Sequence, residues 1–188
     1  MAQIIAADPF TQAINFVFAE EGGYSVDPVP TNKGIEQEEY DLYRAGKGNP
    51  EQTIKAITIA EATEIYTDNY WKPAKVVAGT HDLVSIFCFD TMVNMGISGG
   101  TKIVQQAVST FRDGVWGPHS QAVMETYITA HSELSLVVLC GNIRRDHYRA
   151  IVNHYGQDRQ YLADWLGRTD RLEVLLAARH VSRATGGK

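Results

Sequence analysis

The 188-residue sequence is poor in cysteine and has no long hydrophobic run. Its two cysteines, Cys88 and Cys140, both lie in apolar segments, which favours buried free thiols over a disulfide framework. The longest uninterrupted apolar stretch, LVVLC, is far too short to cross a bilayer. The N-terminal segment MAQIIAADPF has no basic region and reaches Asp8 and Pro9 too early for a secretory signal. We therefore expect a soluble globular protein without stable membrane insertion, made in the cytoplasm.

The sequence also lacks motifs for metals, nucleotides and nucleic acids. Its six histidines form neither an H-E-x-x-H nor a Cys/His pattern, so His147 and His154 are interpreted as surface or packing residues. No glycine loop followed by Lys-Ser/Thr indicates a nucleotide. The Arg-rich segment NIRRDHYRAI is interleaved with acids in an acidic protein, which argues against nucleic acid. We expect no metal, no cofactor and no nucleic-acid partner.

Charge is distributed unevenly along the chain. Residues 1–70 hold 12 acidic and 4 basic residues, whereas residues 142–188 hold 5 acidic and 9 basic ones. The basic end could meet an anionic polymer, and ordinary solvated helix faces explain the pattern equally well. With 44% apolar residues, a chain of this length can bury one substantial core. We expect one compact domain.

The periodicity of apolar residues is helical almost everywhere. Asp8 can cap a helix with Pro9 in its first turn, and Thr58 and Glu61 have the spacing of a capping box. The helix that begins there should end near Tyr70, before Pro73. Residues 24–35 look irregular or hairpin-like. The pattern predicts helices at residues 9–21, 58–70, 82–96, 101–111, 118–130, 132–156 and 160–180.

The first expected helix ends with a carboxylate on its apolar face. Ile14, Val17 and Phe18 form an apolar stripe, which Glu21 continues, whereas Glu20 falls nearer the flank. Burial and the negative end of a helix dipole both raise the pKa of a carboxyl group. Such a group can hold a proton near neutral pH, as the general acid of a glycosidase must. A surface glutamate in the last turn before the Gly-Gly stop explains the spacing as well.

Seven short motifs follow one another along the chain. EGGYSVDP is followed by TNKGI, ATEIYTDNYW, FDTMVNMG, DGVWGPHS, RRDHYRAI and DWLGR. From about Phe10 to Arg171, this ordered set resembles the glycoside hydrolase family 108 muramidases, which are phage endolysins and related bacterial proteins once called secretion activators. The resemblance implies a lysozyme-like enzyme that cuts the bond between N-acetylmuramic acid and N-acetylglucosamine in peptidoglycan. By motif position, the family's catalytic glutamate falls on Glu21.

One departure from the family's pattern concerns a second carboxylate. Family members continue from the DP pair to a second aspartate and a Gly-Gly pair, whereas this chain runs directly from DPVP to TNKGI. Pro30 therefore stands nine residues after Glu21, and the second aspartate has no counterpart. We expect Asp27 and Thr31 to assist at the water and the transition state, and Asn32 to help bind substrate. A non-catalytic wall-binding or secretion-related protein that keeps the fold is the alternative.

Further candidates lie in the helices. Asp90 and Asn94 are four residues apart on an apolar segment, where they could brace the loop after the first helix or contact substrate. Tyr24, Tyr70 and Trp71 could offer flat faces to sugar rings, although such aromatics are more often part of the core. We include these five residues as candidate substrate-binding residues.

The fold expected from these observations is all-α and lysozyme-like, with a short irregular or β-hairpin flap after the first helix. The resemblance implies a catalytic part at residues 1–112 and a helical, peptidoglycan-binding-like part at residues 113–180, with a tail at residues 183–188. The implied partner is the glycan strand of peptidoglycan. We expect a monomer that acts in the periplasm or cell wall after release through a holin or another export route.

Overall fold

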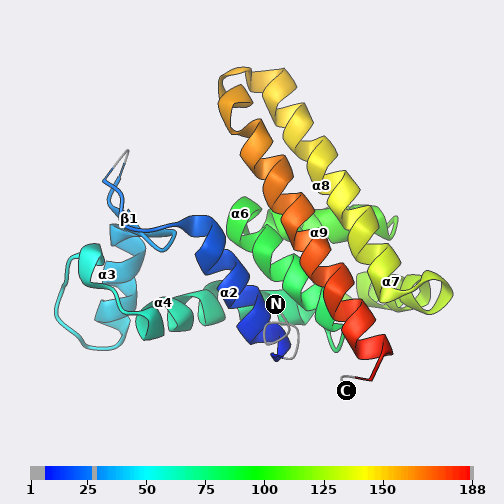
Figure 1. Ribbon diagram of the computed structural model, residues 1–188, viewed down its shortest axis with the longest axis horizontal. Coiled ribbons are helices and arrows are strands. Elements are labelled where there is room, and N and C mark those ends of the chain that lie inside the picture. Colours follow the sequence, from blue (N-terminus) through cyan, green and yellow to red (C-terminus); the bar gives the residue numbers. More distant parts are fainter. Residues whose placement is uncertain (1–6, 27–28, 187–188) are drawn as a thin grey trace.

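The computed structural model describes residues 7–26 and 29–186. The central helix α6 (Asp82–Ala107) packs against α2 (Pro9–Glu21), α5 (Lys72–Ala78), α8 (Glu133–Tyr155) and α9 (Leu162–Ala184). Figure 1 shows α8 and α9 side by side as a long helical pair, with α7 (Pro118–His131) beside α8. A smaller part containing the hairpin and α3 (Gln37–Gly46) lies on the opposite side of α2. The predicted all-α fold with a hairpin flap is confirmed.

Helix α2 begins and ends as its sequence predicts. The Asp8 carboxylate accepts a hydrogen bond from the Thr11 amide at 3.0 Å, and Pro9 occupies the first turn. Gly22, with φ of 72°, ends the helix directly after Glu21. The helix end therefore places the Glu21 side chain at the start of the flap.

The flap is a small antiparallel hairpin. Strand β1 (Thr31–Asn32) pairs with β2 (Ile35–Glu36), and Thr31 lies opposite Glu36. The two turn residues, Lys33 and Gly34, both have positive φ angles of 55° and 76°, as a two-residue type I′ turn requires. Ser25 forms an isolated bridge with Thr31, which ties the preceding loop to the hairpin.

The prediction of a helix end before Pro73 was wrong. The capping box at Thr58 starts α4 (Ile59–Tyr66) as expected, but a π-helical turn, η2 (Thr67–Trp71), carries the chain directly into α5. The Lys72 amide bonds to the Thr67 carbonyl, five residues back. Pro73 then lies in the first turn of α5, where a missing amide hydrogen costs little.

The two helices expected at residues 82–96 and 101–111 are joined in α6, which is interrupted at Gly96 with φ of 74° and ψ of 163°. By length and composition α6 could cross a membrane, but 61% of its most apolar window is buried inside the protein, as in the core helix of a soluble fold. Cys88 of α6 and Cys140 of α8 are both buried and free, as predicted, and burial raises the pKa of Cys88 to about 12.

The remaining elements are short or extend the predicted ones. Periodicity did not indicate α3 or the short 3-10 turns η1 (Ile54–Ala56) and η3 (Gln157–Tyr161). The last helix, α9, continues to Ala184, into the segment expected to be a tail. These differences do not change which segments form the long helices.

Candidate active site

Glu21 and Glu20 point to different arginines of the last helix. An oxygen of Glu21, Oε1, lies 2.6 Å from Nη1 of Arg168, and the Glu21 side chain is 21% exposed. Both oxygens of Glu20 bind Arg171, at 2.7 and 2.6 Å. The Glu20 side chain, which the periodicity placed nearer the flank, is 12% exposed, less than that of Glu21, and it pairs with the exposed Arg171.

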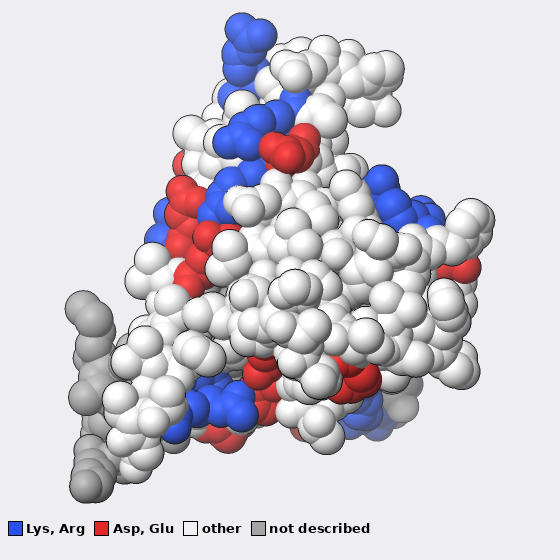
Figure 2. All heavy atoms as spheres, turned by 90° about the vertical axis from the view of Figure 1, so that its right-hand side faces the viewer, with Lys and Arg blue, Asp and Glu red and all other residues white. Residues whose placement is uncertain are grey.

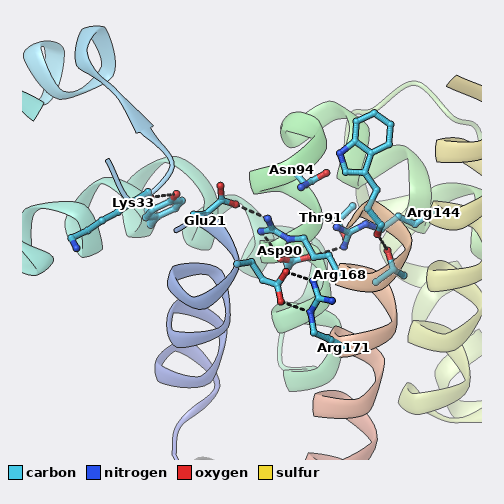
Figure 3. Close-up of polar contacts among 12 residues, drawn as sticks. Glu21, Lys33, Asp90, Thr91, Asn94, Arg144, Arg168 and Arg171 are labelled. Carbon is cyan, nitrogen blue, oxygen red and sulfur yellow. Dashed lines mark hydrogen bonds and ion pairs between the residues drawn. The ribbon is translucent and has the colours of Figure 1, made fainter. Parts of the chain in front are cut away.

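Glu21 is connected through Arg168 to a buried network of ion pairs (Figure 3). Asp90 lies between two arginines: its Oδ2 accepts from Arg144 at 2.6 Å, and its Oδ1 accepts from Nε of Arg168 at 2.9 Å. Burial opposes ionisation of Asp90, but the two guanidinium groups outweigh it and hold the pKa of Asp90 below its usual value. Asp90 is thus ionised at neutral pH and holds both arginines in place.

The network continues along α6 and α8 to Asn94. The Tyr148 hydroxyl accepts a hydrogen bond from Nε of Arg144 at 2.9 Å and donates one to Oδ1 of Asn94 at 2.7 Å. Asp90 and Asn94 are therefore linked through Arg144 and Tyr148 of α8. The bracing expected from their spacing concerned the loop after α2, whereas among the described residues Asp90 holds Arg144 and Arg168, and Asn94 holds Tyr148.

The hairpin turn packs directly on Glu21. A Cβ atom at Gly34 would lie 2.6 Å from the Tyr66 hydroxyl and 2.8 Å from both Cγ and Oε2 of Glu21, so a side chain at this position has no room. The Tyr66 hydroxyl donates a hydrogen bond to the Lys33 carbonyl at 2.8 Å. Burial, and then the charge of Glu21, raise the pKa of Tyr66, which keeps this hydroxyl protonated and able to donate.

Two hollows lie next to residues that contact Glu21, although Glu21 itself lines neither of them. The larger, of about 780 Å³, includes Gly34, which contacts Glu21, and is rich in carboxylates and tyrosines. Its charged and aromatic members are Glu36, Glu38, Glu39, Tyr43, Lys47, Asp68 and Tyr70. The second hollow, of about 680 Å³, includes Arg168, which binds Glu21, together with Asn94 and Trp165. Glu21 is thus connected to both hollows through one lining residue of each.

Residues 14–96 match the family model described as Glycosyl hydrolase 108. The fold is similar to that in the "Structure of Brucella abortus SagA", with 25% sequence identity and a TM-score of 0.68. That likeness covers 90% of this chain and 94% of the SagA chain. These two comparisons support the assignment of the chain to glycosyl hydrolase family 108. No curated protein matches its sequence.

The family match contains Glu21 and Asp90 but ends before the arginines that bind them. Arg144 and Arg168 lie outside residues 14–96, whereas the likeness to SagA extends over most of the chain. The helices after the matched region thus complete the surroundings of Glu21. The part expected to be peptidoglycan-binding-like supplies Arg168 to the candidate site.

The other predicted site residues lie at different distances from this centre. Thr31 is half-buried in β1 beside the loop after α2, and Asp27, the expected assistant of Glu21, lies outside the described residues. The Asn32 amide bonds to the carbonyls of Ile54 and Lys55, both at 3.3 Å, and so holds the hairpin against η1. Both roles at the water remain predictions.

The three aromatic candidates have three different environments. Tyr70 is half-buried and lines the larger hollow, where a sugar ring can reach it. Tyr24 is 44% exposed, with the Lys55 ammonium over its ring. Trp71 packs against the rings of Phe10 and Phe89, which places it with the core. Tyr70 is the aromatic candidate whose position best suits sugar binding.

The sequence contained an unused signal for Arg168 and Arg144. Arg168 lies on a buried stripe of α9 with Leu172 and Leu176, and Arg144 lies on a buried stripe of α8 with Cys140 and Tyr148. A charged residue at an apolar helical position is the same signal that selected Glu21. It identifies a residue that needs a buried partner, but the sequence does not say which one.

Glu39, in the larger hollow, was also missed. Burial raises the pKa of the Glu39 carboxyl, an effect that the Asn69 amide opposes by donating a hydrogen bond at 2.7 Å. Burial, followed by the charges of Glu39, Glu21 and Glu36, raises the pKa of Tyr70. The hollow therefore brings several carboxylates into electrostatic reach of one tyrosine.

The site offers no place for a metal among the described residues. Within residues 7–26 and 29–186, no three His, Cys, Asp or Glu side chains are grouped so that they could hold an ion.

The basic residues of the C-terminal part are largely paired, as where Arg145 contacts Asp170 and Glu173. Figure 2 shows small separate groups of both signs around a broad uncharged area on the α7–α8 side, and no continuous basic surface there.

Proposed function

We propose that this family 108 protein is an N-acetylmuramidase that cleaves peptidoglycan between N-acetylmuramic acid and N-acetylglucosamine. The observation that carries the proposal is the position of Glu21, which lies at the end of α2 and contacts one lining residue of each of the two hollows. A general acid must stand beside the scissile bond while sugar units extend to either side. The contacts of Glu21 with a residue of each hollow support this role for it.

In this mechanism the Glu21 carboxyl protonates the glycosidic oxygen as the bond breaks and the ring develops positive charge. A second group must orient the water or stabilise that charge. We assign this task to Asp27, assisted by Thr31, because both belong to the segment that follows Glu21 and joins the hairpin. Tyr70, Asn94 and the larger hollow provide groups that can bind the sugars.

A non-catalytic wall-binding protein is the second candidate. Two observations favour it: the sequence has Pro30 instead of a second aspartate after Glu21, and Glu21 is held in an ion pair with Arg168. A carboxylate in such a pair must gain a proton before it can act as an acid. A protein that has lost catalysis could retain the same fold and cleft for binding.

Incubation with purified sacculi, followed by mass analysis of the released fragments, separates these candidates. Fragments with reducing ends on N-acetylmuramic acid are expected from the enzyme. Intact sacculi that sediment together with the protein would instead support the wall-binding protein. Reducing ends on N-acetylglucosamine would contradict the proposed bond specificity.

We further propose that the protein acts as a phage or prophage endolysin, a monomer that reaches the wall through a holin or another route. Expression in a bacterium tests this role. Lysis should follow when the inner membrane is breached by a co-expressed pore or by chloroform, and it should be absent with the Glu21→Gln variant. Lysis without any breach would contradict the requirement for a release step.

A further inference from the structure

The guanidinium of Arg168 connects a buried anion to the candidate catalytic carboxylate. Its Nε and Nη2 both lie against Oδ1 of Asp90, at 2.9 and 2.8 Å, which uses one edge of the planar group. This leaves Nη1 directed at Glu21, where it donates the 2.6 Å hydrogen bond. Because the guanidinium is rigid and its side chain is 8% exposed, fixing one edge on Asp90 fixes the direction of the other.

We propose that Arg168 is a positioning residue that orients the Glu21 carboxylate in the cleft and sets the upper pH limit at which Glu21 can donate a proton. The proposal rests on the function proposed above, since it assigns a proton-donating role to Glu21. It also gives the C-terminal helix a part in the reaction, beyond any part in binding the wall.

The charges around Glu21 make Arg168 the group that can exert this control. Asp90, Arg144, Arg168 and Glu21 form a balanced set of two anions and two cations. Arg171 of α9 is paired with Glu20. The Lys33 ammonium, on the hairpin, points away from Glu21 in Figure 3.

The remaining titratable groups facing Glu21 are neutral tyrosines or other carboxylates. Burial raises the pKa of both Tyr66 on α4 and Tyr70 on η2, so their hydroxyls are uncharged. The charges of Glu39 on α3, of Glu36 on β2 and of Glu21 itself all act on Tyr70. Removal of Arg168 therefore takes away the cation that is paired with Glu21.

The direction of the effect follows from the sign of the charge. A cation beside a carboxylate favours the ionised form, so it lowers the pH above which the proton is lost. An acid catalyst works while it is protonated, and its loss of the proton appears as the alkaline limb of the rate profile. Replacement of Arg168 by a neutral residue should move that limb to higher pH, whereas a merely structural role would lower the rate without moving the limb.

The experiment compares Arg168→Met and Arg168→Lys with the natural protein and with Arg171→Met. Arg171→Met is the matched control, because it removes a cation one turn away that is paired with Glu20. For each protein we would measure the pH–rate profile on sacculi, the melting temperature, and the titration of the Glu21 carboxyl carbon by 13C NMR. The Glu21 resonance is assigned by its absence in Glu21→Gln.

Arg168→Met should move the alkaline limb of the rate profile to higher pH, and the pH response of the Glu21 resonance should follow it. Arg168→Lys retains the charge but loses the planar group that contacts Asp90 with one edge and Glu21 with Nη1, so it should lower the rate at least about tenfold while the limb moves less. Arg171→Met should leave the limb in place. An unchanged Glu21 titration in folded Arg168→Met, or an equal shift in Arg171→Met, would overturn the proposal.

Arg168→Met leaves Asp90 with Arg144 alone, so a second variant with balanced buried charge guards the test against loss of the fold. The double variant Asp90→Asn with Arg168→Gln removes one charge of each sign and still takes the cation away from Glu21, so the same shift is expected. The NMR titration needs no catalysis, which separates the two proposals. If Glu21→Gln cleaves sacculi normally, the proposed function fails, whereas an absent titration shift refutes the role of Arg168 alone.

Discussion

Glu21 and Arg168 are 147 residues apart in the sequence, and their side chains meet at 2.6 Å in the cleft. The first described helix and the last helix of the chain thus share one ion pair. Asp90, on the central helix, holds the arginine of this pair in place. The candidate site is therefore assembled from α2, α6 and α9, and its geometry depends on the packing of the whole fold.

Substitution of Gly34 by alanine should damage the site more than the fold. The new methyl group would clash with Glu21 and with the Tyr66 hydroxyl, at 2.8 and 2.6 Å. We expect the rate on sacculi to fall by about 10²-fold, as a displacement of about 1 Å at a catalytic group commonly causes. Thermal unfolding and sacculus turnover measured on the same sample would show both effects.

Gly48→Ala is the control for this variant. Gly48 has a φ of 70°, close to the 76° of Gly34, but no atom lies within 4 Å of the position its Cβ would take. Both variants should lose about 1–2 kcal/mol from the backbone conformation alone. Equal activity in the two variants would show that the contact between Gly34 and Glu21 does not matter.

Asp90→Asn should destabilise the protein and change its response to acid. The substitution leaves two buried arginines facing a neutral amide, which should cost about 3–5 kcal/mol of unfolding free energy. Because the folded-state pKa of Asp90 is lowered, its contribution is complete above its unfolded value of 3.8 and is lost as the pH falls through the folded value. The gap between the two proteins should therefore shrink in acid.

Urea unfolding at several pH values measures this gap. Asp146→Asn provides the comparison, because Asp146 pairs with Arg149 at the surface and is 76% exposed. Its loss should change the unfolding free energy by less than about 1 kcal/mol at every pH. A gap for Asp90→Asn that is small, or that does not change with pH, would be evidence against the buried network.

The sequence predicted the local features of this site better than its long-range contacts. Glu21 and Asp90 could be identified because each interrupts an apolar stripe, and the caps at Asp8 and Thr58 are determined by neighbouring residues. Arg168 interrupts a stripe as well, but its partners lie in distant segments. Periodicity assigns a residue to a buried face without naming what it meets there.

The wrong helix end near Pro73 has a similar origin. Proline disfavours an α-helical residue before it, and this local rule placed a boundary that the structure does not have. A π-helical turn at Thr67–Trp71 lets the chain continue, and the packing of Trp71 on Phe10 and Phe89 favours that continuation. Tertiary contacts thus overrode a correct local preference.

A separate prediction concerns Asp27, which belongs to the loop after α2 that lacks the family's second aspartate. If its carboxylate has taken over the role of the missing aspartate, Asp27→Asn should lower the rate by about 10²-fold or more, and Thr31→Ala should cost less. If Asp27 instead forms a turn by bonding to the backbone, asparagine retains that bond and nearly all the activity. Rates on sacculi and melting temperatures of both variants distinguish these roles. A normal rate and a normal melting temperature in Asp27→Asn would refute the catalytic role assigned to Asp27.

The central claim is that Glu21, and not its neighbour Glu20, carries the proton for cleavage. It is tested most directly by the initial rate of reducing-end release from purified sacculi by Glu21→Gln and Glu20→Gln, each shown to be folded by its melting temperature. The first should lose about 10²-fold to 10⁴-fold or more of the rate, because a positioned general acid is removed. The second loses an ion pair with the exposed Arg171 and should stay within a few-fold of the natural protein. Equal losses in both variants, or no loss in Glu21→Gln, would contradict the claim.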